Sequence, residues 1–218
     1  MTAELPVLDS LDPELVARLT SRRELFTKAA RTLGVAATAP AILSVVATQA
    51  LGQGLPGQVV EVLNFALTLE YLEAEFYQTA LARPRLIPSR YRPVFQQISR
   101  HENAHVRTLT GALGAAAIQK PRFDFTGRGQ YPDVFSNFST FAAVSSTFED
   151  LGVAAYKGQA GNLQGTPVLT TALQIHSVEA RHAAEVRRVR GMFGWDGAFD
   201  QPLTKAQVLA AAAPFIAG

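Results

Sequence analysis

The chain of 218 residues contains no cysteine, and only 17% of its residues are charged. The absence of cysteine excludes disulfides, thiolate zinc sites, iron–sulfur clusters and cysteine nucleophiles. The formal net charge is only +2, and Lys and Arg are scattered without a stripe or interleaved aromatic residues, so nucleic acid is not expected as a partner. β-branched runs are few while alanine is abundant, which favours helices, and the 48% hydrophobic content suffices for one core.

The first 50 residues differ from the rest of the chain. A charged stretch containing Arg22 and Arg23 precedes a weakly apolar run from Leu33 to Ala47, which Pro40 interrupts and small residues follow. This order is typical of an export signal, and the segment resembles a twin-arginine leader. The run is too short to span a membrane. We expect residues 1–50 to direct export to the periplasm or cell envelope, with membrane contact only through this leader. An N-terminal helix packed on the domain remains the alternative.

The remainder, residues 58–218, is predicted to be one all-α domain that follows a linker at 51–57. Four segments carry helical apolar periodicity, at 59–82, 91–113, 136–158 and 167–193. Between the second and third lies a Gly- and Pro-rich stretch, 115–135, which is longer than an antiparallel hairpin needs. About 20 residues can span over 60 Å, while a 24-residue helix is about 36 Å long. This stretch can therefore return along the bundle and join the second and third helices in parallel.

A short alanine-rich helix is expected near the C-terminus, between Thr204 and Ile216. Thr204 is a suitable N-cap, since its hydroxyl can accept a hydrogen bond from the first turn. We expect this helix to cap the bundle.

Two Glu-x-x-His motifs organise the chain. Glu102 and His105 form the first, and Glu179 and His182 form the second. Residues three apart on a helix lie on one face about a turn apart, so each pair can reach one metal ion. In both helices the motif lies on the apolar stripe. His101 lies one position off this stripe and is expected to flank it.

The helix before each motif carries a matching pair of residues. Glu70 precedes the first motif and Glu149 the second, and each is followed seven residues later by a tyrosine, Tyr77 or Tyr156. A spacing of seven returns each tyrosine to the face of its glutamate, two turns on. The helix pair is thus repeated after about 78 residues. A glutamate on a buried face is costly unless it is paired or binds a cation.

The four glutamates and two histidines can hold two divalent ions, because four carboxylates balance two M²⁺. Without metal, four buried carboxylates would repel and some would take up protons. Oxygen and imidazole ligands suit iron or manganese. Tyr77 and Tyr156 could orient ligands, or could simply pack in the core. His176 is expected to be structural or to support a ligand, and a metal-free hydrogen-bonded network is the alternative for the whole set.

Residues 63–77, residues 149–158 and the tail at 199–214 carry a family resemblance. From about residue 58 to 216 the chain resembles the ferritin-like superfamily, and in particular exported ferritin-like domain proteins similar to plant desiccation-related proteins. The resemblance implies a four-helix bundle around a carboxylate-bridged di-iron or di-manganese centre. It implies less about activity, since the superfamily includes ferroxidases, oxygenases, peroxide-consuming enzymes and members with no known reaction.

Two functions are compatible with the sequence. The first is a redox enzyme of ferroxidase, peroxidase or catalase type that acts on O₂, H₂O₂ or Fe²⁺ during oxidative or desiccation stress. The second is a non-enzymatic protein that binds metal or protects the cell envelope, with homo-oligomers formed through its alanine-rich surfaces.

Overall fold

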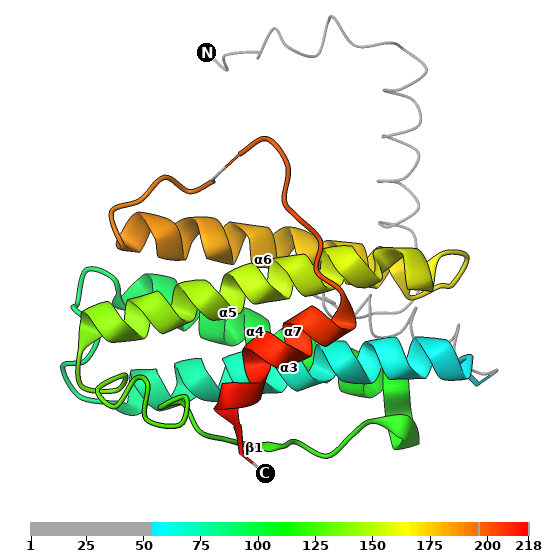
Figure 1. Ribbon diagram of the computed structural model, residues 1–218, viewed down its shortest axis with the longest axis horizontal. Helices are drawn as coiled ribbons and strands as arrows, with labels where there is room; N and C mark the ends of the chain where they lie inside the picture. The colour runs from blue at the N-terminus through cyan, green and yellow to red at the C-terminus, as the bar shows by residue number, and fades with distance from the viewer. Residues whose placement is uncertain (1–53, 196, 218) are drawn as a thin grey trace, which may run out of the picture. The chain divides into compact units, whose positions relative to one another are not determined.

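The computed structural model describes residues 54–195 and 197–217, and four long helices dominate this part of the chain (Figure 1). They are α3 (Gly57–Ala82), α4 (Arg92–Leu113), α5 (Phe138–Gln159) and α6 (Leu169–Val189). The expected leader at 1–50 and the first part of the expected linker, 51–53, lie outside the described residues. None of the described helices is long and apolar enough to cross a membrane.

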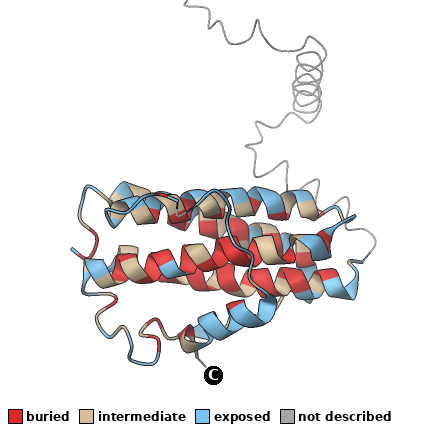
Figure 2. Cartoon of the chain, turned by 45° about the horizontal axis from the view of Figure 1, so that its top comes forward, coloured by how far each residue is buried: buried red, intermediate tan, exposed pale blue. Residues whose placement is uncertain are grey.

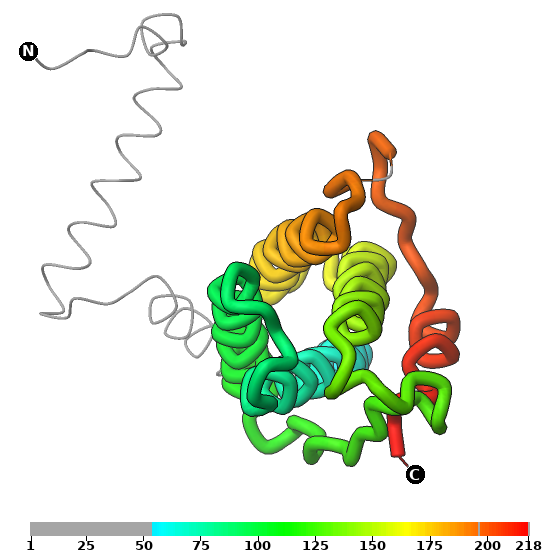
Figure 3. The backbone as a smooth tube through the Cα atoms, turned by 90° about the vertical axis from the view of Figure 1, so that its left-hand side faces the viewer, coloured from blue at the N-terminus to red at the C-terminus, as the bar shows by residue number. Residues whose placement is uncertain are grey.

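The four helices surround a common core. Helix α3 packs against α4 and α5 packs against α6, and the end-on view in Figure 3 shows all four around one centre. Buried residues lie on the inward faces of the helices, while their outward faces are exposed (Figure 2). The predicted all-α four-helix bundle is confirmed.

The connection between α4 and α5 runs back along the bundle, so these two helices point in the same direction (Figure 1). It contains the short 3-10 helix η1 (Gly114–Ala116) and strand β1 (Arg122–Phe123). Strand β1 pairs antiparallel with β2 (Ile216–Ala217), and the Asp124 N–H donates to the Phe215 carbonyl at 2.8 Å. The predicted parallel crossover is therefore present, and the C-terminus holds it in place.

Helix α6 ends four residues earlier than the sequence pattern predicts. The apolar periodicity predicts a helix to Phe193, but the last helical residue is Val189. Gly191 has a φ of +77°, a left-handed conformation that ends helices and that glycine adopts without steric cost. The described residues after it form a loop, in which Met192, Phe193 and Trp195 are exposed, rather than a further turn of helix.

The C-terminal helix α7 (Lys205–Ala212) begins directly after Thr204, as predicted. Thr204 and Gln207 form a reciprocal capping box, in which each side chain binds the backbone N–H of the other residue. The 3-10 helix η3 (Ala213–Phe215) follows and leads into β2.

Helix α7 packs against the side of the bundle and does not cap an end. Its Val208 and Ala212 contact a cluster on α3 and α5 that includes Phe65, Leu69 and Leu151. Figure 3 shows α7 outside the ring of four helices. The expectation that this helix caps the bundle is wrong in this respect, because its apolar residues match the side of α3 and α5.

Two apolar clusters fill the core, one toward each end of the bundle. One is rich in aromatic rings and includes Phe76, Phe95, Phe141 and Phe148. The other is mainly aliphatic and includes the helix residues Leu63, Leu67, Val59, Leu109 and Ile175. On each of the four helices, the glutamates and histidines that the sequence singled out lie between residues of the two clusters. The polar centre is therefore closed at both ends by apolar side chains.

Candidate metal centre

All six predicted ligands converge at the middle of the bundle. Each of the four helices contributes from its buried stripe: Glu70 from α3, Glu102 and His105 from α4, Glu149 from α5, and Glu179 and His182 from α6. The four glutamates are 0% exposed, and the two histidines are 7% and 5% exposed. Helical periodicity places each residue inward, and the antiparallel pairing brings the two motifs face to face.

The six side chains form two overlapping sets of candidate ligands. One set contains Glu70, Glu102, His105 and Glu179, and the other contains Glu102, Glu149, Glu179 and His182. Within each set, one ligand atom from every residue lies within 4.8 Å of the others. Glu102 and Glu179 belong to both sets, so they are in position to bridge two ions. Each set also has one glutamate and one histidine of its own.

Both imidazoles turn Nδ1 toward the carboxylates. His105 Nδ1 lies 2.9 Å from Glu179 and 3.2 Å from both Glu70 and Glu102. His182 Nδ1 lies 2.8 Å from Glu102 Oε1 and 3.3 Å from Glu149 Oε2. Three-residue spacing presents His105 Nδ1 beside Glu102, one turn before it, whereas His182 Nδ1 is farther, 3.9 Å, from Glu179. The two nitrogens therefore point at the space enclosed by the four carboxylates.

The tyrosines form a reciprocal pair across the bundle. The Tyr77 hydroxyl donates to Glu149 Oε1, and the Tyr156 hydroxyl donates to Glu70 Oε1, both at 2.5 Å. Each tyrosine thus orients the glutamate of the opposite half-repeat rather than the one on its own helix. Both rings also belong to the apolar clusters, Tyr77 to the aromatic one and Tyr156 to the aliphatic one. Both tyrosines thus pack in the core, and each also holds a hydrogen bond to a candidate ligand.

Several ligand atoms lack a hydrogen-bond partner. Among the described residues, the buried atoms without one include Glu102 Oε1, Glu149 Oε2, both carboxylate oxygens of Glu179 and His182 Nδ1. His182 Nδ1 and Glu102 Oε1 are 2.8 Å apart but lack hydrogen-bond geometry. Buried polar atoms are rarely left unsatisfied, because the lost hydration costs about 1–3 kcal/mol per group. Converging unpaired oxygens and an imidazole nitrogen fit divalent cations, so this cluster can hold metal ions.

Electrostatics in the metal-free cluster agree with this interpretation. Burial raises the pKa of Glu70 to about 7, partly offset by His105, and burial with the neighbouring carboxylates raises the pKa of Glu179 well above its ordinary range. Burial also opposes ionisation of Glu102, but the close contacts and charges of His105 and His182 lower its pKa to about 2. The cluster therefore retains protons in the absence of metal, and bound cations would replace them.

A fifth buried carboxylate, Glu73, was not identified from the sequence. It is 2% exposed and lies one turn after Glu70 on α3. Burial raises the pKa of Glu73 well above its ordinary value, and the charge of Glu179 raises it further. Five carboxylates exceed the charge that two divalent ions balance, so we expect Glu73 to keep its proton at neutral pH. The sequence feature that could have identified Glu73 is its spacing of three residues from Glu70, which places both on the same helix face.

Gly152 on α5 leaves the space that Glu73 and Glu179 occupy. A Cβ atom at this position would lie 3.1 Å from Glu179 Oε2 and 3.3 Å from Glu73 Oε1. These distances are shorter than ordinary contacts, so a larger residue would displace one of the two carboxylates. Glycine within a helix costs about 0.5–1 kcal/mol relative to alanine, and here it gives room to the centre.

The other two histidines have different positions. His101, expected only to flank the site, has its Nδ1 2.8 Å from Nε2 of His182, and the two rings stack. It therefore supports His182 from the side away from the carboxylates. His176 belongs to neither ligand set. Glu61 is exposed and Glu75 pairs with Lys120 at 2.5 Å, so both point away from the centre.

A four-helix bundle whose helices supply Glu, Glu-x-x-His, Glu and Glu-x-x-His to a buried centre defines the ferritin-like class. Residues 58–192 match the family model of the ferritin-like domain. The match covers more than half of the chain, which therefore belongs to the ferritin-like domain family.

One curated relative is Protein rds1 of Schizosaccharomyces pombe. It is 23% identical to the chain over 163 residues, an alignment that covers 72% of this chain and 39% of that protein. The chain thus corresponds to well under half of this relative's length.

Proposed function

We propose that this protein binds two divalent ions, iron or manganese, and acts as a redox enzyme that reduces O₂ or peroxide or oxidises Fe²⁺. The observation that carries the proposal is the pair of ligand sets that share Glu102 and Glu179 in a fully buried space. Held by the residues of these two sets, two ions of iron or manganese would supply the capacity to exchange electrons with an oxidant. Side chains of the protein itself would position the ions, exclude water and hold a proton, as described next.

The protein would control this chemistry by positioning and by excluding water. Glu102 and Glu179 would hold the ions at a defined separation, and Tyr77 and Tyr156 would fix the orientation of Glu149 and Glu70 through their short hydrogen bonds. The apolar clusters at both ends would keep solvent from the centre. Glu73, whose pKa burial raises well above its ordinary value, would hold a proton near Glu179 for use when an oxidant is reduced.

A cleft between α4 and α6 offers a route for a small oxidant. It has a volume of about 400 Å³ and is lined by residues that include Gln97, His101, Arg181 and His182. His182 also belongs to the candidate metal centre, so the cleft reaches the edge of that centre. A molecule of the size of peroxide fits in this cleft, whereas the apolar clusters close both ends of the bundle.

The proposed cellular role is protection of the periplasm or cell envelope during oxidative or desiccation stress. It depends on the interpretation of residues 1–50 as an export leader, which the sequence motivates through Arg22, Arg23 and the apolar run that follows.

The test is elemental analysis of the protein purified from its own host, together with peroxide consumption and Fe²⁺ oxidation assays. We expect close to two equivalents of iron or manganese, lost in Glu102→Ala and His182→Ala, with turnover lost in parallel. Glu61→Ala and His176→Ala are matched controls, because these residues have the same chemistry but belong to neither ligand set. Both controls should retain metal and activity.

Unchanged turnover in Glu102→Ala or His182→Ala would contradict the proposal. Stoichiometric metal without turnover would instead favour the non-enzymatic alternative, in which the same centre stores metal or stabilises a protective bundle.

A further inference from the structure

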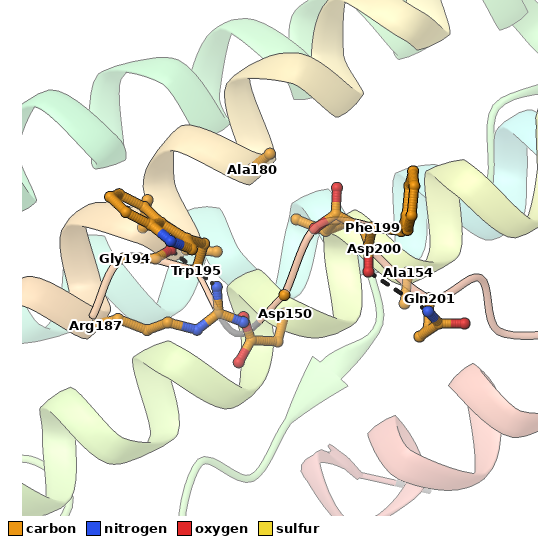
Figure 4. Close-up of a pocket in the computed structure, with 13 residues that line it drawn as sticks. Asp150, Ala154, Ala180, Arg187, Gly194, Trp195, Phe199, Asp200 and Gln201 are labelled. Carbon is orange, nitrogen blue, oxygen red and sulfur yellow. Dashed lines mark hydrogen bonds and ion pairs between the residues drawn. The ribbon is translucent and has the colours of Figure 1, made fainter. Parts of the chain in front are cut away.

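A second cleft lies on the outer side of α5 and α6, under the loop that follows α6. Its volume is about 490 Å³, within the range of small-molecule sites. The floor consists of small residues, Val153, Ala154, Ala180, Ala183 and Ala184. Figure 4 shows Trp195 toward one end and Phe199 toward the other, with Asp150 and Arg187 between them.

The two aromatic rings of this cleft are unusually exposed. Trp195 is 64% exposed and Phe199 is 83% exposed, although both are large apolar side chains. Exposed aromatic rings beside small floor residues provide flat faces on which a planar ligand can stack. The cleft therefore favours an aromatic molecule over a flexible aliphatic one.

The charged groups in the cleft already have partners. Arg187 Nη2 lies 2.6 Å from Asp150 Oδ1, and Arg187 Nη1 donates to the Gly194 carbonyl at 3.2 Å. Asp200 pairs with Lys157 at 3.6 Å. A charged ligand would have to displace one of these ion pairs, at a cost in desolvation. The side-chain amide of Gln201 also lines the cleft, so a neutral ligand with hydroxyl groups suits the polar surface.

The cleft and the candidate metal centre are on different faces of the same two helices. Asp150, Ala180 and Ala183 line the cleft, and each directly follows a candidate ligand, respectively Glu149, Glu179 and His182. The backbone of the two helices therefore lies between a molecule in the cleft and the centre, a separation on the order of 10 Å. This is a suitable place for an electron donor that need not touch the metals.

We propose that this cleft binds a neutral hydroquinone-type phenol, which supplies the two electrons for reduction of peroxide at the buried centre. The inference rests on the proposed function, which requires a reductant. The overall step balances: the hydroquinone loses two electrons and two protons to become a quinone, and H₂O₂ accepts both to give two molecules of water. The O–O bond breaks, and four O–H bonds are present in the products.

Trp195 provides a direct measure of binding, because it is the single tryptophan of the chain. The full-length protein is titrated with methylhydroquinone in the absence of oxygen and peroxide, and its fluorescence is recorded. We expect a saturable change, both in the metal-loaded protein and in Glu102→Ala, since the cleft does not include Glu102. Phe199→Ala should raise the dissociation constant about tenfold, and Ala180→Leu, which fills the floor, should abolish the saturable change.

Phe193→Ala is the matched control, because Phe193 is also 83% exposed but does not line the cleft. This variant should bind methylhydroquinone like the parent. With peroxide present, the metal-loaded parent should form quinone, whereas Phe199→Ala and Ala180→Leu should form it more slowly at limiting donor and still contain two equivalents of metal.

The outcomes separate this inference from the proposed function. A fluorescence change that is linear in donor, or equal in Phe193→Ala and Phe199→Ala, would overturn the inference even if peroxide consumption is confirmed. Saturable binding without metal-dependent quinone formation would overturn the donor role, whereas the proposed redox function would be overturned only if peroxide consumption and Fe²⁺ oxidation were also absent. Sedimentation gives a further test. If the parent protein is an oligomer and both Phe193→Ala and Phe199→Ala dissociate it, the rings make contacts between copies, and the inference is overturned.

Discussion

At the scale of single residues, the centre depends on contacts that cross between the two halves of the repeat. Tyr77 follows Glu70 by seven residues but binds Glu149, and Tyr156 follows Glu149 but binds Glu70. The spacing of seven explains why each tyrosine lies on the site face. It does not specify the partner, which depends on how α3 and α5 pack. Glu73 and His101 illustrate the same limit, since only packing shows that they meet Glu179 and His182.

The substitution Gly152→Ala tests the space at the centre. The added Cβ would meet Glu179 Oε2 at 3.1 Å and Glu73 Oε1 at 3.3 Å, so one carboxylate must move. We expect metal affinity to fall by about tenfold or more, while helix α5 itself becomes no less stable, because alanine favours helices over glycine. Competition with a chelator measures the affinity, and urea unfolding of the metal-free protein measures the stability.

Gly161→Ala is the control for this experiment, since a Cβ at Gly161 meets nothing within 4 Å. Unchanged metal affinity in Gly152→Ala would show that Glu179 does not need its observed position to bind metal.

At the scale of elements, the C-terminal segment stabilises the long crossover. Helix α7 packs on α3 and α5, and β2 pairs with β1 within the crossover. Phe215, between them, packs edge-on against Phe148 with ring centroids 4.7 Å apart. Sequence alone predicted the crossover from its length and α7 from the Thr204 cap. The pairing of two strands of two residues each carries too little pattern to be predicted.

Thr204→Ala is expected to lower the free energy of unfolding by about 1 kcal/mol, because it removes the hydroxyl that caps the first turn of α7. Urea unfolding monitored by circular dichroism measures the change. Thr204→Ser, which keeps the hydroxyl, should retain most of the stability. Metal content should be the same in both variants, since α7 lies outside the ring of four helices, and a loss of metal in Thr204→Ala would contradict this separation.

At the scale of the whole molecule, the buried carboxylates make the fold of the metal-free protein dependent on pH. A carboxyl whose folded pKa is raised stabilises the fold below its unfolded pKa and loses this contribution as pH rises through the folded value. Glu70, with an unfolded pKa of 4.5 and a folded pKa of about 7, behaves in this way, mainly because of burial. Burial lowers the pKa of His182, but the carboxylates of Glu149 and Glu102 outweigh this effect and raise the pKa from 6.5 to about 11. The contribution of His182 to the stability of the fold therefore also decreases as pH rises above 6.5.

The two effects have the same sign, so the metal-free protein should lose thermal stability as pH rises from about 5 to about 8. Glu102 has the opposite effect, because its pKa is lowered to about 2. Its contribution to the stability of the fold is lost only as pH falls from 4.5 toward 2. Bound metal should largely remove the loss between pH 5 and 8, because cations replace the protons. Calorimetric melting temperatures with and without metal test this. A metal-free protein that is equally stable at both pH values would contradict the raised pKa values.

The sequence by itself determined the helices, the parallel crossover and the six residues that line the centre, because each of these depends on local features of the chain. The period of 3.6 residues per turn places Glu102 beside His105, and the length of the loop sets the reach of the crossover. Tertiary structure decided which side chains meet across helices. It joined Tyr77 to Glu149 and His101 to His182, brought Glu73 to Glu179 beside Gly152, and placed α7 on the side of the bundle. These contacts join residues far apart in the chain, and the relative rotation of packed helices, which sets them, leaves no regular pattern in the sequence.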